Sequence, residues 1–414
     1  MPANRTLLAN TALSTGSVLA IRVALLAATM LLLARALGPV AFGAFVGIAA
    51  VAVIAGSLAS LGTHLVVMRD TAQDCELGEQ SVRYAAWATA VGAAILLLVY
   101  LFAALAWLRP EGVGLAAILA IGFADTFLHP FLQLISARLL GTGRVASSQL
   151  LLSLPVVLRF LSVALLFATQ PADALTAYCL LYFLSMLAAL AVALLAWQHM
   201  LPPLRTWRPP NRREWADAGR YAVLNITAAS PGELDKALSL RLLSAEGAGL
   251  YAAASRIVGA TTLPVAALML SALPRLFSQH SGRNDLLTPF IFVTSSLYGL
   301  LAGTTALLCS GVVSQILGTG YEGIAAVITT LAFGIPAMSL RLAGTTTLMT
   351  SGRPWIRVAV EGIGLIILGG GAVSLGTMLQ DQALPVAFVL SEWAMAVIAW
   401  VILIRRRDTA ARSQ

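Results

Sequence analysis

Charged residues are scarce in this sequence. Of its 414 residues only 11% are charged, whereas 59% are hydrophobic, and the mean hydropathy is +0.88. Soluble domains carry about a quarter charged residues, so this chain has too few to cover a surface in contact with water. The shortage excludes a soluble enzyme or a soluble binding module and indicates a protein embedded in a lipid bilayer.

Cysteine and lysine are also rare. The three cysteines, Cys75, Cys179 and Cys309, stand far apart, which excludes a disulfide framework and a cysteine metal site. All but one of the 26 basic residues are arginines, and the exception is Lys236. The net charge of +8 does not indicate nucleic-acid binding, because the arginines lie between apolar blocks rather than on one helix face. We therefore expect no nucleic-acid partner.

What the sequence does contain is a series of long apolar runs. A helix needs about 20 apolar residues to cross the hydrocarbon core. The first run extends from about Gly16 to Leu37 through Arg22, which is too long for a signal-peptide core and predicts an uncleaved first span. The runs predict an all-α integral membrane protein with twelve transmembrane helices, over residues 16–37, 42–68, 82–108, 113–136, 148–168, 175–199, 218–243, 248–273, 288–317, 323–349, 356–379 and 383–404.

The arginines give these spans an orientation. Most of them fall in the N-terminus, the even-numbered loops and the C-terminal tail, whereas the odd-numbered loops hold only Arg35, Arg109 and Arg241. Because cytoplasmic loops carry the excess of basic residues, both termini are predicted to be cytoplasmic, in a bacterial inner membrane. The seventh span, 218–243, carries several charges, and the alternative is an amphipathic surface helix. That alternative would place the later arginine clusters on the opposite side from Arg205–Arg213.

A basic, proline-rich connection divides the chain into two halves of six spans. At one constant offset, Leu32, Arg35, Leu37, Gly43 and Phe45 match Leu238, Arg241, Leu243, Gly249 and Tyr251. Such an echo predicts a parallel repeat, and transporters built from repeats place the substrate path between them. The predicted organisation is a six-helix lobe at 1–200, a linker at 201–217, a second lobe at 218–404 and a cytoplasmic tail at 405–414.

Three stretches resemble a known family. They are Ala34–Phe45 (ARALGPVAFGAF), followed by Leu61-Gly62-Thr63-His64 and Arg69-Asp70; Leu234–Arg256; and Leu317–Arg353. The sequence resembles the polysaccharide-transport flippases of the multidrug/oligosaccharidyl-lipid/polysaccharide exporter superfamily. The resemblance implies a two-lobed flippase that moves an undecaprenyl-diphosphate-linked oligosaccharide to the periplasmic leaflet, for O-antigen or exopolysaccharide assembly. Its implied partners are that lipid-linked oligosaccharide, membrane lipids, a polysaccharide polymerase and glycosyltransferases.

Ionisable residues inside predicted spans are the candidates for function, because burying them in lipid is costly. A diphosphate crossing the membrane needs cations, and guanidinium groups grip phosphate bidentately. Arg22 and Arg256 are the first choices for phosphate contact, followed by Arg341. The chain also resembles, more distantly, the lipid-linked murein-precursor flippases, whose first and eighth spans carry cavity arginines. The alternatives are that Arg22 pairs with Asp125 or extends toward the membrane interface.

The seventh span concentrates further candidates. Pro231 and Gly232 predict a kink that acts as a hinge. Glu233 and Lys236 are spaced to form an ion pair on one helix face. Asp235, like Asp125 in the first half, is a candidate carboxylate for coupling transport to a proton or sodium gradient. The alternative is a neutralised cluster that only fixes packing. No other cofactor and no metal are expected.

Two other functions compete with the flippase. A cation-coupled multidrug exporter of the same superfamily would favour acidic residues in the first lobe. That half instead sets Asp125 against Arg22 and Arg159, which argues for an anionic substrate. A membrane-embedded polysaccharide-synthesis enzyme would need a large periplasmic loop or an acidic catalytic motif. All the odd-numbered loops are short, so we do not expect an enzyme.

Overall fold

The protein is represented by a computed structural model that describes residues 2–108, 112–229, 232–278, 287–350 and 354–412. All regular secondary structure in these ranges is helical, which confirms the all-α prediction. The chain folds into two compact units. Unit 1 comprises Met1–Leu37 and Ile48–Ala229, and unit 2 comprises Gly38–Gly47 and Ser230–Gln414.

Within the described residues, eight helices are long and apolar enough to cross a membrane, or nine if a bent pair counts as one span. Two of the eight exceed one crossing. Ala24–Ala59 contains Gly38 at φ 72° and ψ 170°, which breaks the helix. Trp355–Arg405 has 51 residues and comprises two helices, Pro354–Leu379 and Ala383–Arg412, which are joined by the turn Gln380–Gln382 and pack against each other. Twelve crossings and cytoplasmic termini stay predictions.

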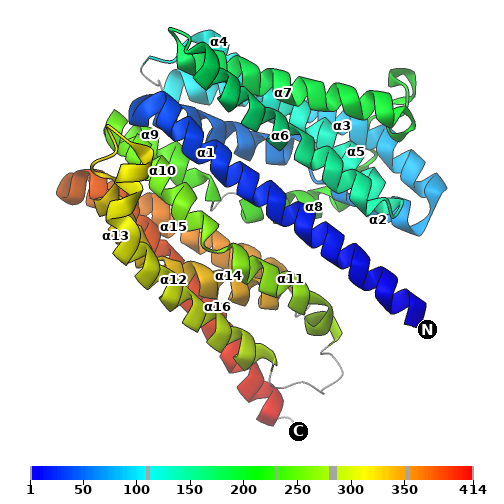
Figure 1. Cartoon of the computed structure of the whole chain (residues 1–414). Coiled ribbons are helices and arrows are strands. Elements are labelled where there is room, and N and C mark those ends of the chain that lie inside the picture. The colour runs from blue at the N-terminus through cyan, green and yellow to red at the C-terminus, as the bar shows by residue number, and fades with distance from the viewer. Residues whose placement is uncertain (1, 109–111, 230–231, 279–286, 351–353, 413–414) are drawn as a thin grey trace. The chain divides into compact units, whose positions relative to one another are not determined.

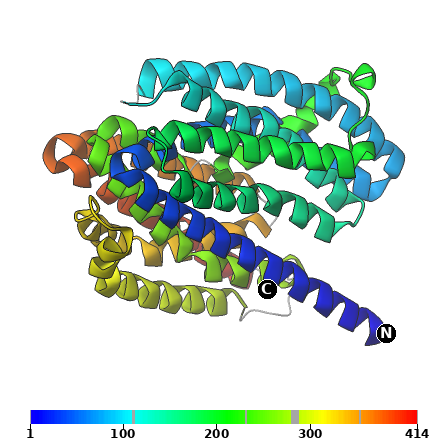
Figure 2. The same cartoon turned by 45° about the horizontal axis from the view of Figure 1, so that its top comes forward.

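Unit 1 is a set of packed helices, seen in blue, cyan and green in Figures 1 and 2. Its elements are α1 (Pro2–Ala59, to Leu37 and again from Ile48), α2 (Thr63–Gln73), α3 (Cys75–Phe102), the π-helix η1 (Ala103–Leu108), α4 (Leu115–Gly122), the π-helix η2 (Phe123–Leu128), α5 (His129–Gly141), α6 (Val145–Thr169), α7 (Ala174–Ala196), the short 3₁₀ turns η3 (Gln198–Met200) and η4 (Leu204–Thr206), and α8 (Arg212–Ala229).

Helix α7 begins at an aspartate cap. Asp173 accepts a hydrogen bond from the backbone N–H of Thr176 at 3.0 Å, which satisfies one of the free donors of the first turn. The backbone and side-chain hydrogen bonds from Thr176 lower the pKa of the exposed Asp173 carboxyl. This local signal fixes where the helix that carries Tyr178 and Tyr182 starts.

The proline-rich connection is packed against unit 1 rather than loose. Arg138 at the end of α5 donates to the carbonyl oxygens of His199 and Met200, at 3.0 and 2.8 Å. The Trp207 ring stacks on Phe131 with centroids 5.9 Å apart. These contacts fix the segment that leads from α7 to α8.

Helix α8 is amphipathic and lies against α2. Arg69 forms ion pairs with Asp70 and with Asp217 of α8, both at 2.8 Å. Glu214 accepts two hydrogen bonds from Arg208 at 2.9 and 2.7 Å. Partial burial raises the pKa of Glu214, but these bonds and one from the Asn211 N–H outweigh it, so the pKa is lowered overall. The charged face of α8 is therefore held by ion pairs to α2 and to the segment that precedes α8.

The stretch predicted as the seventh span, 218–243, is divided into two helices, and the interruption falls where Pro231 and Gly232 predicted a kink. That this stretch crosses the membrane stays a prediction. Helix α8 ends at Ala229, α9 begins at Leu234, and neither helix is among the candidate spans. The physical reason is the composition of this stretch, because the charges that make α8 amphipathic and the run from Gly232 to Lys236 deny both pieces a long apolar window. Pro231, the predicted kink residue, lies outside the described residues.

Unit 2 contains the break at Gly38, the start of the second part of α1, and the remaining helices. They are α9 (Leu234–Leu242), α10 (Ala245–Ala260), α11 (Leu263–Ser278), α12 (Leu287–Leu317), α13 (Ile324–Ala332), α14 (Ile335–Thr350), α15 (Pro354–Leu379), the turn η7 (Gln380–Gln382) and α16 (Ala383–Arg412).

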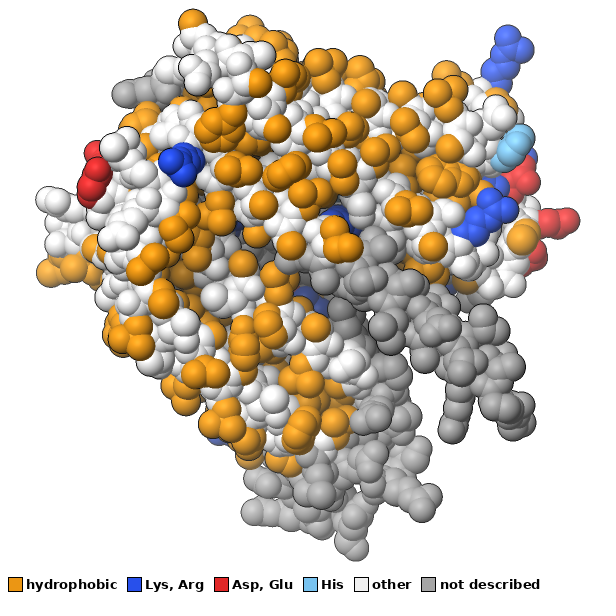
Figure 3. Space-filling view, viewed as in Figure 1, with side chains coloured by type: hydrophobic (Ala, Val, Ile, Leu, Met, Phe, Trp, Pro, Cys, Tyr) orange, Lys and Arg blue, Asp and Glu red, His pale blue; other side chains and the backbone are white. Residues whose placement is uncertain are grey.

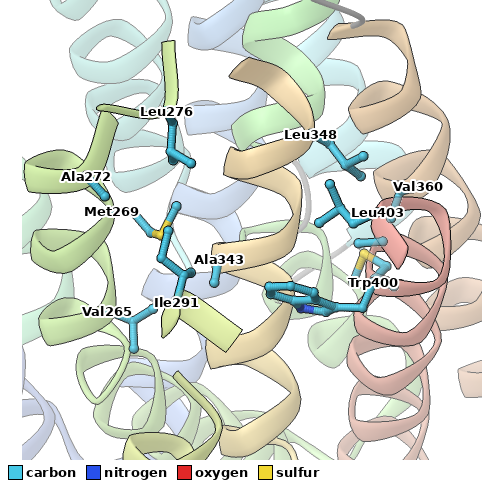
Figure 4. Close-up of a cluster of buried hydrophobic side chains, with 12 residues drawn as sticks. Val265, Met269, Ala272, Leu276, Ile291, Ala343, Leu348, Val360, Trp400 and Leu403 are labelled. Atoms are coloured by element: carbon cyan, nitrogen blue, oxygen red, sulfur yellow. The ribbon is translucent and has the colours of Figure 1, made fainter. Parts of the chain in front are cut away.

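The core of unit 2 gathers side chains from α11, α12, α14, α15 and α16 (Figure 4). Trp400 is its largest member, and its indole N–H donates to the carbonyl oxygen of Leu340 at 2.9 Å. Phe292 meets the Trp400 ring edge-on at 4.7 Å between centroids. The tryptophan thus buries a large apolar area while its one polar atom is satisfied.

The outer surfaces are apolar. On the described part of the face in Figure 3, hydrophobic side chains are spread widely and charged ones are few. Leu195, Met378 and Leu308 are 81%, 80% and 78% exposed, on α7, α15 and α12. Exposed leucines at this density would be unfavourable in water and suit contact with lipid tails.

Two glycines allow α1 and α10 to touch within unit 2. A Cβ on Gly43 would lie 2.6 Å from the backbone N of Gly249, and one on Gly249 would lie 1.9 Å from the carbonyl oxygen of Pro39. Small residues at such positions let helix backbones approach closely in membranes. The repeat in the sequence pairs these same two glycines.

This contact makes Gly249→Ala a destabilising change. The added methyl meets backbone atoms that cannot move aside, so we expect a loss of about 1–3 kcal/mol in unfolding free energy. Gly259, on the same helix, has nothing within 4 Å of an added Cβ, so Gly259→Ala is the matched control and should be neutral or slightly stabilising. Thermal unfolding of the two purified variants compares them, and equal midpoints would contradict the close approach.

Candidate functional site

The charged centre of unit 1 is Asp125, which is 4% exposed. The hydroxyl of Tyr182 on α7 lies 2.9 and 2.7 Å from the two oxygens of the Asp125 carboxylate and donates to it. Arg159 on α6 reaches the same carboxylate at 3.4 Å. Its guanidinium carbon also lies 3.6 Å from the centre of the Tyr182 ring, in a cation–π contact. Three helices therefore meet at one buried carboxylate.

Backbone geometry explains why Asp125 stands there. It lies on the π-helical turn η2, between α4 and α5, and π-helical turns inside α-helices are frequent at functional sites. A Cβ on Gly56 of α1 would lie 2.1 Å from the Asp125 carbonyl oxygen, and one on Gly122 would lie 2.5 Å from the Tyr100 ring. Only glycine allows these neighbours to pack so closely around the turn.

Of the two arginines that the sequence set against Asp125, Arg159 forms an ion pair with it. The pairing of Arg22 with Asp125 was an alternative for Arg22, and the structure pairs Asp125 with Arg159. Arg22, on α1, is half-buried and has no ion-pair partner among the described residues. Its charge and that of Arg159 both lie within electrostatic reach of His129. Arg22 is thus a half-buried cation without an ion-pair partner among the described residues.

His129 follows Asp125 by one turn and packs in the interior of unit 1. Its Nε2 lies 2.9 Å from the side-chain nitrogen of Gln133, and His64 contacts the Ser60 hydroxyl at 2.7 Å. Each histidine therefore has a hydrogen-bond partner four residues away along the chain. Asp125 on η2 and His129 and Gln133 on α5 are polar residues spaced four apart.

Unit 2 has its own buried charge centre, on α9. Asp235 and Lys236 are 1% and 5% exposed. The Lys236 ammonium lies 3.1 Å from one oxygen of Asp235 and also donates to the carbonyl oxygen of Gly232. The Tyr251 hydroxyl on α10 donates to the other oxygen of Asp235 at 2.8 Å. The predicted Glu233–Lys236 pair is wrong, because the lysine turns to Asp235 instead.

Three further ion pairs surround this centre in unit 2. Glu233 pairs with Arg256 through two contacts of 3.2 Å. Glu392 pairs with Arg341 at 2.5 Å, and Glu361 pairs with Arg357 at 2.9 Å. Two of the three predicted cavity cations, Arg256 and Arg341, are therefore already bound to carboxylates. Of these three pairs, only Arg357–Glu361 has the i,i+4 spacing from which an ion pair can be predicted, because the others join different helices.

The sequence did not predict the two tyrosines that donate hydrogen bonds to these carboxylates. Tyr182 and Tyr251 lie far from Asp125 and Asp235 in the chain, and no spacing rule connects them. No group of three or more histidine, cysteine, aspartate or glutamate side chains in the described ranges is placed to hold a metal ion. The arrangement can hold and exchange charge inside an apolar helical bundle, with one carboxylate centre in each unit.

Comparison with known proteins identifies solved structures with a similar fold. No protein-family model matches the chain, and no curated protein matches its sequence. Among solved structures, it is similar to an inward-facing multidrug resistance MATE family transporter of the MOP superfamily, with a TM-score of 0.77 and 14% identity over 95% of this chain and 96% of that one.

Two further structures share this fold. An outward-facing multidrug resistance MATE family transporter has a TM-score of 0.63 and 15% identity, over 95% of this chain and 97% of that one. A MOP superfamily transporter from Pyrococcus furiosus has a TM-score of 0.63 and 14% identity, over 94% and 96% of the two chains. The molecule is thus an all-helical membrane protein with a transporter fold. That fold is the one seen in MATE transporters of the MOP superfamily.

Proposed function

We propose that this protein is a multi-pass transporter that works by alternating access. The support is a fold shared over 95% of the chain with structures described as inward-facing and as outward-facing. A fold that adopts both conformations suits a cycle in which a substrate site opens to one side of the membrane and then to the other. We place it in a bacterial inner membrane, in keeping with its arginine distribution.

Within this class we propose export of small amphipathic molecules, coupled to a proton or cation gradient. The similar structures described as multidrug resistance transporters support it better than they support a flippase. The observation that carries it is the Asp125 centre, a buried carboxylate on a π-helical turn with its cation at 3.4 Å. A buried carboxylate that is paired with an arginine can gain a proton or bind a cation and release Arg159. This exchange would couple an ion to a rearrangement of α4, α6 and α7.

The second candidate is a flippase for a lipid-linked oligosaccharide. The observation that favours it is Arg22, a half-buried cation without an ion-pair partner among the described residues. A guanidinium group of this kind can bind a diphosphate. The structure from Pyrococcus furiosus is described as having a binding pocket of reverse polarity that suggests a different function. Pocket charge can thus separate functions in this fold. A polysaccharide polymerase and glycosyltransferases would then be partners.

One pair of cell assays separates the two candidates. The protein is expressed in cells lacking their own drug exporters and in cells lacking a polysaccharide flippase. Drug resistance and surface polymer are then measured. The exporter predicts resistance to cationic dyes such as ethidium that survives Arg22→Ala. The flippase predicts restored polymer that Arg22→Ala removes, whereas Arg35→Ala, an exposed arginine on the same helix, leaves it intact. Failure of wild-type protein in both assays would overturn both candidates.

A further inference from the structure

The only lysine in the chain is buried. Lys236 is the exception among 26 basic residues, and it is 5% exposed on α9. Arginine and lysine differ in a way that matters here, because guanidinium is a broad, planar fork whereas an ammonium group is a compact point charge. A chain that uses arginine at every other basic position has lysine at the one place where a small cation fits.

The partners of Lys236 are oxygen atoms of two kinds. Its ammonium group donates to a carboxylate, that of Asp235 at 3.1 and 3.4 Å, and to the backbone carbonyl of Gly232. Gly232 lies in the interruption between α8 and α9, where its carbonyl is not used by a continuing helix. Unwound backbone carbonyls at broken helices coordinate monovalent cations in transporters, and carboxylates complete such sites.

Tyr251 completes the arrangement by fixing the carboxylate. Its hydroxyl donates to the Asp235 oxygen Oδ2 at 2.8 Å, while Oδ1 makes the shorter of the two contacts with the ammonium group. Tyr251 is fully buried on α10, so the carboxylate cannot rotate freely when its cation leaves. The Asp235 carboxylate would therefore remain in place without the ammonium group.

The charges around Lys236 are already paired, which disfavours binding of an additional cation. Three further carboxylates of unit 2, those of Glu233, Glu361 and Glu392, each have their own arginine partner. Asp235 pairs with Lys236 in the same way, so these four carboxylates of unit 2 are balanced by four cations. A metal ion added to this set would be an excess positive charge in an apolar interior, which is costly.

We propose that the Asp235 carboxylate and the Gly232 carbonyl form a monovalent-cation site that the chain fills with the ammonium group of Lys236. The lysine is a tethered cation, so unit 2 needs no sodium ion for its folded structure. The site is inferred from this geometry alone. A consequence for transport is that Asp125 in unit 1 would couple the ion, and this consequence rests on the proposed function.

Thermal unfolding of the purified full-length protein in detergent tests the site without any transport. The wild-type midpoint should be the same in sodium chloride and in choline chloride at equal ionic strength. Lys236→Ala opens the site, so its midpoint should be lower in choline and should rise in a saturable way with sodium, lithium or potassium. Lys236→Ala combined with Asp235→Asn should lose that response. No cation response in Lys236→Ala, or the same response in wild type, would overturn the proposal.

A second measurement covers the case in which Lys236→Ala does not fold. Because the chain has one lysine, an amine-reactive reagent labels only Lys236 and the N-terminal amine. In folded wild-type protein Lys236 should label far more slowly than after denaturation, and Asp235→Asn should speed its labelling. Labelling of Lys236 in folded wild type at the denatured rate would show that no site holds the ammonium group.

Discussion

Asp125→Asn is expected to reduce ethidium transport by proteoliposomes carrying the purified protein to the level of empty liposomes. The amide has the shape of the carboxylate, and its one oxygen can still accept a hydrogen bond from the Tyr182 hydroxyl, but it can neither take up a proton nor hold Arg159 by charge. The exchange that would couple an ion to movement of α4, α6 and α7 is then lost, while the packing around η2 is kept.

The matched control is Asp173→Asn in the same unit. Asp173 is an exposed cap of α7 that a neutral asparagine can replace, so transport should persist. Thermal unfolding of Asp125→Asn checks that the loss does not come from misfolding. Wild-type transport rates in a well-folded Asp125→Asn protein would remove Asp125 from the coupling mechanism, and would leave the fold-based proposal of a transporter standing.

Glu392→Ala is expected to destabilise unit 2 severely. Glu392 is 1% exposed and pairs with Arg341 across α14 and α16, so its removal leaves a guanidinium group buried without its carboxylate. Breaking a buried pair from one side costs about 3–5 kcal/mol, because the remaining charge keeps its desolvation penalty. The unfolding midpoint of the purified protein should fall accordingly.

The double variant tests that reason. Arg341→Met with Glu392→Ala removes both charges, so most of the lost stability should return, although each partner alone is destabilising. Glu246→Ala, an exposed acid on α10, should leave the midpoint almost unchanged. If the double variant were as unstable as the two single changes added together, the pair would not be the source of the effect.

The sequence predicted what depends on local composition. Apolar runs predicted the helices, and the predicted gap between the first two spans falls at the break at Gly38. Gly43 and Gly249, which the repeat aligned, lie in contact. The seventh predicted span is two helices, α8 and α9, and the sequence predicted the position of the interruption but not its length.

The pairing of charges could not be predicted, because it depends on which helices become neighbours. Arg159 rather than Arg22 reaches Asp125 since α6 packs beside α5 and α7. Lys236 pairs with the adjacent Asp235, although neighbours in a helix do not face each other, because its long stem bends back to the start of α9. Partners on separate helices follow from tertiary packing and not from spacing.

Distance measurement between spin labels tests alternating access most directly. Cys75 is exposed in unit 1, and Ile404, 54% exposed on α16, can be changed to cysteine in unit 2 after Cys179 and Cys309 are replaced. Both label positions lie on the predicted cytoplasmic side. The proposal predicts two distance populations in reconstituted protein, with a ratio that shifts when ethidium is added or the pH is lowered. A single distance that stays the same under all these conditions would contradict it.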